Sequence, residues 1–261
     1  MIKAKKSLGQ NFLIDHKILE IIVNTIDIEN KTVLEIGPGT GNLTNYIFKK
    51  KPKKVLAIEK DNKLAEDLGS KYLNNLQIIN DDVLNINENN LFEEKVIVFG
   101  NLPYNISTEI LSKWIVNLGD NFWFEALVLM FQKEVADRIV ANINSSNYGR
   151  LTILANWKLN ISKITDIKPN SFKPKPKVDS SLLFFTPKKD FYKIKNPKNL
   201  EKITRIFFNN RRKMIKKPYN QIFNGDLRVL ENLKINLNLR PQNLSYETYY
   251  KLTEEYEILN G

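Results

Sequence analysis

The chain has 261 residues, a formal net charge of +11 and no cysteine, so it can bury one large core or two modest ones but cannot form disulfides or thiolate-ligated metal sites. A single histidine, His16, argues against a histidine-rich metal site or a catalytic triad. No apolar run approaches the roughly 20 residues of a membrane span, and the first ten residues lack the apolar stretch of a signal peptide. We therefore expect a cytoplasmic protein with no metal and no membrane partner.

The first two-thirds of the chain alternate short apolar runs with amphipathic helical stretches, which is the pattern of parallel strands joined by helices. Strands are expected over Thr32–Ile36, Val55–Ile58, Leu76–Ile79, Lys95–Phe99 and Ala126–Phe131. Helices are expected over Asn42–Lys50, Asn62–Leu73, Ser107–Leu118 and Lys133–Asn142. The predicted fold class is therefore α/β, with a Rossmann-like sheet.

Two later strand-like runs, Ile161–Ile167 and Ser180–Phe185, flank the Pro-rich loop KPNSFKPKPKVD. This connection predicts an antiparallel pair that closes one edge of the sheet. After Pro187 the pattern becomes helical, with helices expected over Leu200–Asn209, Leu227–Leu233 and Tyr246–Tyr256. We therefore predict a sheet domain over residues 1–187 and a small all-helical domain over residues 188–261.

The predicted helical domain carries most of the excess positive charge. Residues 188–261 contain 16 Lys and Arg against 8 Asp and Glu, whereas residues 1–187 contain 24 against 21. A Lys-rich composition caused by an AT-rich genome would be spread evenly, and a solvated helix face does not account for an Arg-Arg-Lys triplet. The concentration predicts a polyanionic partner, with nucleic acid as the leading candidate. Phosphate contacts are expected from Arg205, Arg211, Arg212, Lys213, Lys216 and Lys217.

The first predicted strand ends in VLEIGPGTGNLT, where Gly37, Gly39 and Gly41 allow a tight turn into the next helix and close approach of a ligand. A dinucleotide fingerprint needs its third glycine one position later, where this chain has Asn42. With Glu35 before the turn, the spacing looks instead like the S-adenosylmethionine loop of Rossmann-like methyltransferases. For such a loop alone, an unrelated Gly-rich turn is the alternative.

Acidic side chains follow the next two strands. Glu59 comes 22 residues after Gly37, where a carboxylate can accept hydrogen bonds from both ribose hydroxyls. Asp81 and Asp82 follow the third strand; Asp82 can accept from an adenine amine, and Asp81 can be a turn or cap residue. One acid at a strand end is common, but three acid-terminated strands beside a Gly-rich loop argue against coincidence.

The fourth strand ends in the motif NLPY. The carboxyl ends of parallel strands form the ligand crevice, so this motif should face the cofactor. Asn101 Oδ1 and the Leu102 carbonyl can accept the two hydrogens of an adenine amine, with Pro103 fixing that carbonyl. Tyr104 can stack on the base, which is worth about 1–3 kcal/mol. Such acceptors orient and polarise a weakly nucleophilic amine without a strong base, whereas a plain turn explains only Asn101 and Pro103.

The N-terminal segment KKSLGQNFLID precedes the first expected helix. A disordered basic tail does not account for Gln10, Asn11, Phe12 and Leu13 together. We expect the segment to fold over the pocket and to place Gln10, Asn11 and Leu13 at the cofactor. His16 is expected at a helix start or on the surface rather than as a base.

Taken together, the motifs resemble those of the ribosomal RNA adenine N6,N6-dimethyltransferases, most closely the bacterial small-subunit enzymes. The resemblance spans nearly the whole chain and rests on KKSLGQNFLID, LEIGPGTGNLT, AIEKD, NDDVL, VFGNLPYNIST, FQKEVADRI, NYGRLT, FKPKPKVDSSL and RRKM, in that order. It implies a class I methyltransferase sheet with a helical C-terminal domain and S-adenosyl-L-methionine as methyl donor. It also implies, as substrate, two adjacent adenosines near the 3′ end of 16S rRNA in a pre-30S particle, on which a monomer would act.

The resemblance also assigns residues. It implies that the cofactor site is lined by Asn11, Leu13, Gly37, Glu59, Asp82 and Asn101. Asn101, Leu102 and Tyr104 would handle the target base. Phe172 would be a second aromatic that sandwiches the flipped adenine, although it could equally be a loop anchor packed beneath the prolines.

Other functions remain open at this point. After NIST the small-subunit enzymes usually have Pro, whereas Glu109 is reminiscent of the sister group that methylates 23S rRNA and confers macrolide resistance; a helix start also suits Glu. The RRKM motif and the overall length favour the small-subunit group. A non-catalytic ribosome-assembly factor with a residual site is a second alternative. An N5-glutamine methyltransferase, which uses a related clamp, is disfavoured by the basic helical domain, and a dehydrogenase by Asn42.

Overall fold

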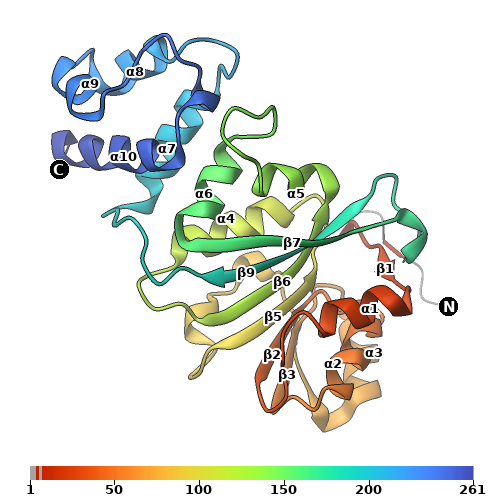
Figure 1. Ribbon diagram of the computed structural model, residues 1–261. Coiled ribbons are helices and arrows are strands. Elements are labelled where there is room, and N and C mark those ends of the chain that lie inside the picture. Colours follow the sequence, from red (N-terminus) through yellow and green to blue (C-terminus); the bar gives the residue numbers. More distant parts are fainter. Residues whose placement is uncertain (1–3, 6–7, 261) are drawn as a thin grey trace. The chain divides into compact units, whose positions relative to one another are not determined.

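The computed structural model describes residues 4–5 and 8–260, which form two compact units (Figure 1). The first unit contains the chain up to Lys113 together with Leu118–Ala136 and Ile161–Pro187. The second contains Trp114–Asn117, Asp137–Asn160 and the chain from Lys188 onward.

The boundaries of these units differ from the single predicted domain boundary after residue 187. Residues 137–160 group with the C-terminal helices because α6 (Arg150–Lys158) is tied to them by hydrogen bonds. Trp157 Nε1 donates to the Tyr192 carbonyl at 2.7 Å, and Tyr250 Oη donates to the Ile153 carbonyl at 3.0 Å. The division into a domain over 1–187 and one over 188–261 is therefore too simple for the region before residue 161.

A seven-stranded sheet organises the first unit. Its order is β4 (Leu76–Ile79), β3 (Lys54–Ile58), β2 (Thr32–Ile36), β5 (Val96–Asn101), β6 (Phe124–Gln132), β9 (Ser180–Pro187) and β7 (Leu159–Ile167). The first five strands pair in parallel, and β9 pairs antiparallel with β6. The five predicted parallel strands are present within two residues at each end, and the two later strands are neighbours at the sheet edge, as expected.

Helices pack on both faces of this sheet. Figure 1 shows α1 (His16–Val23), α2 (Asn42–Lys49) and α3 (Asn62–Tyr72) on one face and α4 (Ser107–Asn117) on the other. Coverage on both faces explains why β2 is buried along its whole length and reads as a continuous apolar run apart from Thr32 and Glu35. The core between the sheet and the first three helices includes Leu19, Val33, Ile47, Val55, Leu68, Ile97 and Phe99.

The N-terminal segment is part of this fold. β1 (Phe12–Leu13) pairs antiparallel with β8 (Phe172–Lys173) in a small separate sheet, with Leu13 opposite Phe172. Asp15 then caps α1 by accepting from the Lys17 and Ile18 amides, so His16 is the first helical residue, as predicted. From Leu8 onward the segment is therefore folded rather than a free tail, whereas Lys6 and Ser7 lie outside the described residues.

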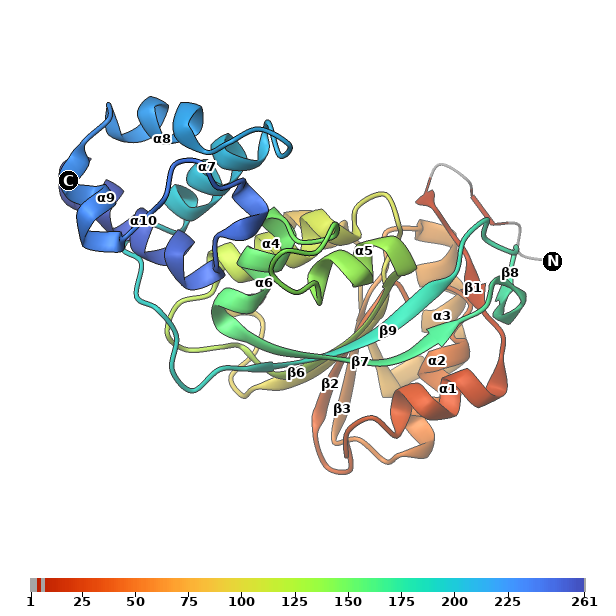
Figure 2. The same cartoon turned by 45° about the horizontal axis from the view of Figure 1, so that its top comes forward.

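The C-terminal part of the second unit is helical, as the sequence predicts. The three expected helices are α7 (Pro197–Phe208), α9 (Leu227–Leu233) and α10 (Tyr246–Asn260), and a further helix that was not predicted, α8 (Lys216–Phe223), precedes α9; Figure 2 shows them from a second direction. Phe207 and Phe208 of α7 pack against Tyr249 of α10, at ring-centroid distances of 5.6 and 5.7 Å. Among the residues that the structure describes, no helix combines the length and apolar character needed to cross a membrane.

Candidate active site

A pocket lies at the carboxyl ends of the parallel strands, where the doubly wound arrangement places ligands. Its lining comes from residues 8–13, 35–40, 42–43, 58–60, 81–83 and 101–106, together with Met130. Every one of these segments belongs to the first unit. The structure thus brings the N-terminal segment, the Gly-rich loop, the acidic strand ends and the NLPY loop to one place.

The Gly-rich loop contributes two glycines to the lining. Both Gly37 and Gly39 have positive φ values, of +65° and +60°. A Cβ on Gly37 would meet no protein atom within 4 Å, so its Cα faces open space. A Cβ on Gly39 would come within 2.9 Å of the Phe12 ring, so glycine here lets the N-terminal segment lie on the loop. The prediction of a glycine turn that a ligand can approach closely fits Gly37 best.

Gly41 was predicted to contact the cofactor, but it does not line the pocket. A Cβ there would lie 2.8 Å from Leu68 Cδ2 and 2.9 Å from Tyr72 Oη, so glycine is needed to pack α2 against α3. The neighbouring Asn42 has a role that the sequence did not reveal. Its Nδ2 donates to the Leu13 carbonyl at 2.7 Å and holds the N-terminal segment at the start of α2.

The acid that follows β3 is buried and held by backbone amides. Glu59 Oε2 accepts from the Gly39 amide at 3.1 Å, and Oε1 accepts from the Asp61 amide at 2.8 Å. Burial raises the pKa of the Glu59 carboxyl, and these two hydrogen bonds oppose the shift. The carboxylate is therefore fixed at the pocket wall, with further lone pairs on each oxygen to accept from a ligand.

Asp82 lies at the pocket and caps a short 3₁₀ helix, η3 (Val83–Asn85), by accepting from the Leu84 amide at 3.0 Å. Its other oxygen accepts from Lys60 Nζ at 2.6 Å. Burial raises the pKa of Asp82, but the Lys60 ammonium and the Leu84 amide outweigh burial and hold the pKa below its ordinary value. Asp81 bonds only locally in the described contacts, to the Asp82 amide and Asn85, which fits the predicted turn role.

Asn101 and the three residues after it all line the pocket. Asn101 Nδ2 donates to the Asn11 carbonyl at 2.7 Å, which leaves Oδ1 as the acceptor of that amide. The Leu102 side chain is buried, and the Ile106 amide closes a turn on the Pro103 carbonyl at 3.1 Å. Tyr104 Oη is 2.5 Å from Ser180 Oγ of β9, which fixes the far end of the ring. Ser180 is a positioning contact that the sequence did not single out.

The predicted residues of the N-terminal segment line the pocket and are anchored at several points. Gln10 Nε2 donates to Asp61 Oδ2 at 3.0 Å, and Lys5 Nζ lies 2.9 Å from Asp61 Oδ1. Asn11 and Leu13 are held through their carbonyls by Asn101 and Asn42. Asp61 also caps α3, a role that a sequence pattern can indicate, but its bonds to residues 5 and 10 depend on the folded chain.

Phe172 departs from the expectation that it sandwiches a base. Its side chain is only 3% exposed, belongs to the apolar core beside Leu13 and does not line the pocket. Of the two interpretations that the sequence left open, base stacking and a loop anchor, this structure agrees with the loop anchor. The physical reason is the β1–β8 pairing, which places Phe172 over the core of the first unit.

The six predicted phosphate-binding residues differ in how exposed their side chains are. Five have exposed side chains: Arg205, Arg212, Lys213, Lys216 and Lys217. Arg211 is half-buried instead; its Nη2 donates to the Ser145 carbonyl at 3.2 Å, and its Nε is buried with no hydrogen-bond partner among the described residues. Arg211 therefore braces the second unit, which the Arg-Arg-Lys pattern did not indicate.

The strand order, the helices on both faces and the pocket at the strand ends define a class I methyltransferase fold. The family model for "Ribosomal RNA adenine dimethylase" matches residues 1–257, and the chain belongs to that family. Enzymes of this family transfer methyl groups, which accords with a pocket that places acids and the NLPY loop together.

Named relatives agree with the family. The "Ribosomal RNA small subunit methyltransferase A" of Pelagibacter ubique is 65% identical over 260 residues, which cover 100% of this chain and 99% of that protein. The protein of the same name from a Wolbachia of Drosophila simulans is 41% identical over 263 residues, covering 99% and 96%.

Solved structures agree as well. A dimethyladenosine transferase from Plasmodium falciparum superposes with a TM-score of 0.81 at 30% identity, covering 95% of this chain and 98% of that one. The 23S rRNA methyltransferase ErmE superposes with a TM-score of 0.69 at 23% identity, covering 95% and 100%, and supports the fold alone.

Proposed function

We propose that this protein transfers methyl groups from S-adenosyl-L-methionine to N6 of two adjacent adenosines near the 3′ end of 16S rRNA, during assembly of the small subunit. The observation that carries the proposal is the Asn101 amide, whose Nδ2 is committed to the Asn11 carbonyl at the pocket. Its Oδ1 is thereby available to accept a hydrogen from a planar exocyclic amine. The family and the 65% identical relative supply the choice of ribosomal RNA.

The pocket residues fit S-adenosylmethionine, which when bound supplies an electrophilic methyl group on its sulfonium. The buried Glu59 carboxylate would accept from the two ribose hydroxyls, and Asp82 would accept from the adenine amine. The open space at Gly37 lets the backbone approach a ligand closely. Gln10, Asn11 and Leu13 would close the pocket from the N-terminal side.

The NLPY loop would hold the target base. Asn101 Oδ1 and the Leu102 carbonyl would accept the two hydrogens of the adenine amine and aim its lone pair at the methyl group. Tyr104, whose hydroxyl is fixed by Ser180, would stack on the base. Catalysis in this site would come from orientation and electrostatic stabilisation, since both groups are acceptors and neither is a strong base.

The exposed cations of the second unit would bind the RNA backbone. Arg205, Arg212, Lys213, Lys216 and Lys217 are the candidates, because their side chains are exposed. Phosphate contacts position a nucleic acid without reading its sequence, so this surface would supply affinity while the pocket supplies selectivity for adenine.

The decisive experiment measures transfer of labelled methyl groups to small-subunit particles and to 23S RNA, both isolated from cells that lack the modification. We expect label in N6,N6-dimethyladenosine of 16S rRNA only. Transfer only to 23S RNA would identify the macrolide-resistance activity instead. Binding to the particle without transfer, unchanged in an Asn101→Ala variant, would identify a non-catalytic assembly factor.

A further inference from the structure

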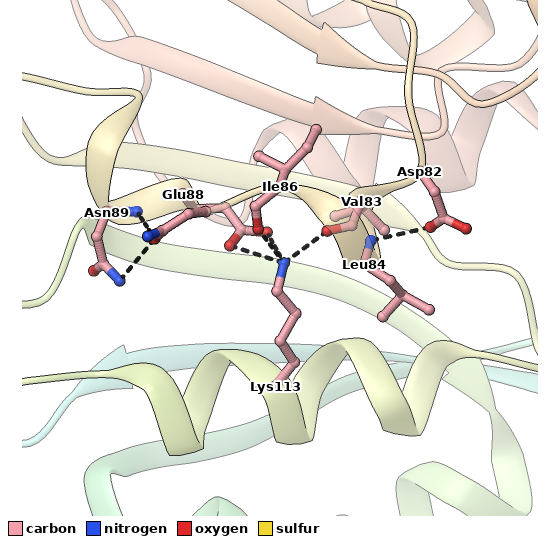
Figure 3. Close-up of polar contacts among 8 residues, drawn as sticks. Asp82, Val83, Leu84, Ile86, Glu88, Asn89 and Lys113 are labelled. Atoms are coloured by element: carbon pink, nitrogen blue, oxygen red, sulfur yellow. Dashed lines mark hydrogen bonds and ion pairs between the residues drawn. The ribbon is translucent and has the colours of Figure 1, made fainter.

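Lys113 of α4 reaches across to the segment that follows Asp82 (Figure 3). Its Nζ donates to the Val83 carbonyl at 2.7 Å and to the Ile86 carbonyl, and it lies 3.0 and 3.1 Å from the two carboxylate oxygens of Glu88. An ammonium has three hydrogens to donate, and here two carbonyls and one carboxylate accept them.

The Lys113–Glu88 pair lies in the interior of the first unit. The side chains of Lys113 and Glu88 are 17% and 4% exposed. Taking both charges out of water carries a desolvation cost that an apolar side chain at position 113 would avoid. The helix already has apolar anchors, because Ile110 and Leu111 are fully buried. The lysine is therefore not needed merely to attach α4 to the core.

The segment that receives Lys113 lacks the regular hydrogen bonding of a strand or an α-helix. It contains only the short 3₁₀ helices η3 and η4 (Glu88–Asn90). The Val83 carbonyl accepts one hydrogen bond within the segment, from the Ile86 amide at 3.3 Å, and Lys113 Nζ donates a second, shorter one at 2.7 Å. Val83 is buried at the pocket, and Asp82 next to it caps η3 through the Leu84 amide. The bonded carbonyls thus lie within one to four residues of the pocket acid.

The other end of the connection lies at the NLPY loop. Helix α4 begins at Ser107, three residues after Tyr104, and Lys113 lies further along the same helix. A single side chain therefore joins the helix that continues from the target-base loop to the segment that presents Asp82.

We propose that Lys113 is a positioning residue that sets the placement of the Asp82–Val83 cofactor-adenine subsite relative to the NLPY loop. The inference rests on the proposed function, because it assigns the adenine of S-adenosylmethionine to Asp82. Loss of the ammonium would release the 83–88 segment and misplace the Asp82 acceptor. Cofactor affinity would fall, while RNA binding by the second unit would not.

The test measures binding of S-adenosylhomocysteine by calorimetry, with folding checked by thermal unfolding. Lys113→Met alone leaves Glu88 without this cation and can fail to fold, so the main variant combines Lys113→Met with Glu88→Gln. We expect its Kd to rise about tenfold, which corresponds to the loss of one good hydrogen bond to the ligand. Affinity for 16S rRNA without cofactor should remain that of the wild type, and Lys113→Arg should recover part of the cofactor affinity.

Lys31→Met with Glu125→Gln is the matched control, because it also removes both charges of a Lys–carboxylate pair, Lys31–Glu125 at 2.9 Å, but of an exposed pair away from the pocket. It should bind S-adenosylhomocysteine like the wild type. A folded double variant with wild-type Kd, or one that loses RNA affinity equally, would overturn the proposal. Failure of the wild type itself to bind S-adenosylhomocysteine would instead contradict the proposed function.

Discussion

The carbonyl of Asn11 accepts a hydrogen bond from the side-chain amide of Asn101 at 2.7 Å, across 90 residues of sequence. The N-terminal segment is therefore not only a cover of the pocket. It also determines which atom of the Asn101 amide is left to accept from a substrate. The same segment is held by Asn42 at Leu13 and by Asp61 at Gln10, so the orientation of the clamp depends on three separate anchors.

Replacing Asn101 by Asp should nearly abolish methyl transfer. The carboxylate has no hydrogen to donate, so it would place a charged acceptor against the Asn11 carbonyl and turn away from it. We expect kcat to fall by about 100-fold or more, as when a preorganised polar group is removed from an active site. Single-turnover methylation of small-subunit particles measures the loss.

Asn105→Asp is the control for the added charge, because Asn105 is exposed and lies four residues further along the chain. It should lose much less activity than Asn101→Asp. Equal losses in the two variants would show that negative charge near the pocket, rather than the orientation of Asn101, causes the effect.

Replacing Asp61 by Ala should weaken cofactor binding by releasing Lys5 and Gln10. The Asp61 amide that donates to Glu59 is a backbone group and remains in the variant. The helix cap is lost as well, which costs about 1 kcal/mol of stability. We expect the Kd for S-adenosylhomocysteine to rise about five- to tenfold, measured by calorimetry well below the unfolding temperature.

Asp226→Ala is the control that separates loss of a helix cap from loss of the contacts with Lys5 and Gln10. Asp226 caps α9 in the second unit in the same way that Asp61 caps α3. It should lower the unfolding temperature without changing cofactor affinity. If Asp61→Ala also kept the wild-type Kd, the N-terminal segment would not depend on this anchor.

Two substitutions of Tyr104 should separate its ring from its hydroxyl. Tyr104→Phe removes the contact with Ser180 but keeps the ring, so kcat/KM for the RNA substrate should fall only a few-fold. Tyr104→Ala also removes base stacking, worth about 1–3 kcal/mol, and should lower kcat/KM by roughly 5- to 150-fold. Steady-state methylation assays on particles compare the two, and equal losses would contradict a stacking role for the ring.

Much of this site could be predicted from sequence because its parts lie at strand ends. Alternating strand and helix patterns place Glu59 and Asp82 after two parallel strands and Asn101 at the end of the next, and parallel strands bring their carboxyl ends to one edge. The fold and the pocket position of these three residues therefore followed from local patterns and one topological rule.

The rest depended on contacts between distant residues. Helix α6 escaped prediction because six of its nine residues are buried, which leaves no polar face to give a helical period. The β1–β8 pairing involves two residues on each side, too few to give a pattern, yet it moves Phe172 into the core. Ser180, Lys113 and the anchoring role of Asp61 likewise become visible only when the chain is folded.

RNA binding should depend on salt through the exposed cations of the second unit. Replacing Lys216 and Lys217 together by Gln should reduce the slope of log Kobs against log salt concentration by about 2, one for each phosphate contact. Filter binding at several salt concentrations measures the slope. Lys31→Gln with Lys53→Gln removes the same charge from exposed positions next to the amino ends of β2 and β3 and should leave the slope unchanged. A slope unaffected by the first pair would show that RNA binds elsewhere.

The free energy of unfolding should decrease as the pH rises from about 4.5 to about 7, because of Glu35. Its carboxyl is fully buried and accepts from Thr44 Oγ1 at 2.7 Å, and burial raises its pKa to about 7. Over this pH range the folded state keeps a proton that the unfolded state releases, so the free energy of unfolding decreases as pH rises, by on the order of 3 kcal/mol in all.

Glu35→Gln retains an acceptor for Thr44 and has no proton to lose. It should match the wild type near pH 5 and exceed it at pH 8 in urea unfolding, whereas Glu66→Gln, at an exposed position of α3, should show no such pH-dependent gain. A Glu35→Gln variant whose advantage is the same at both pH values would contradict a buried, protonated Glu35.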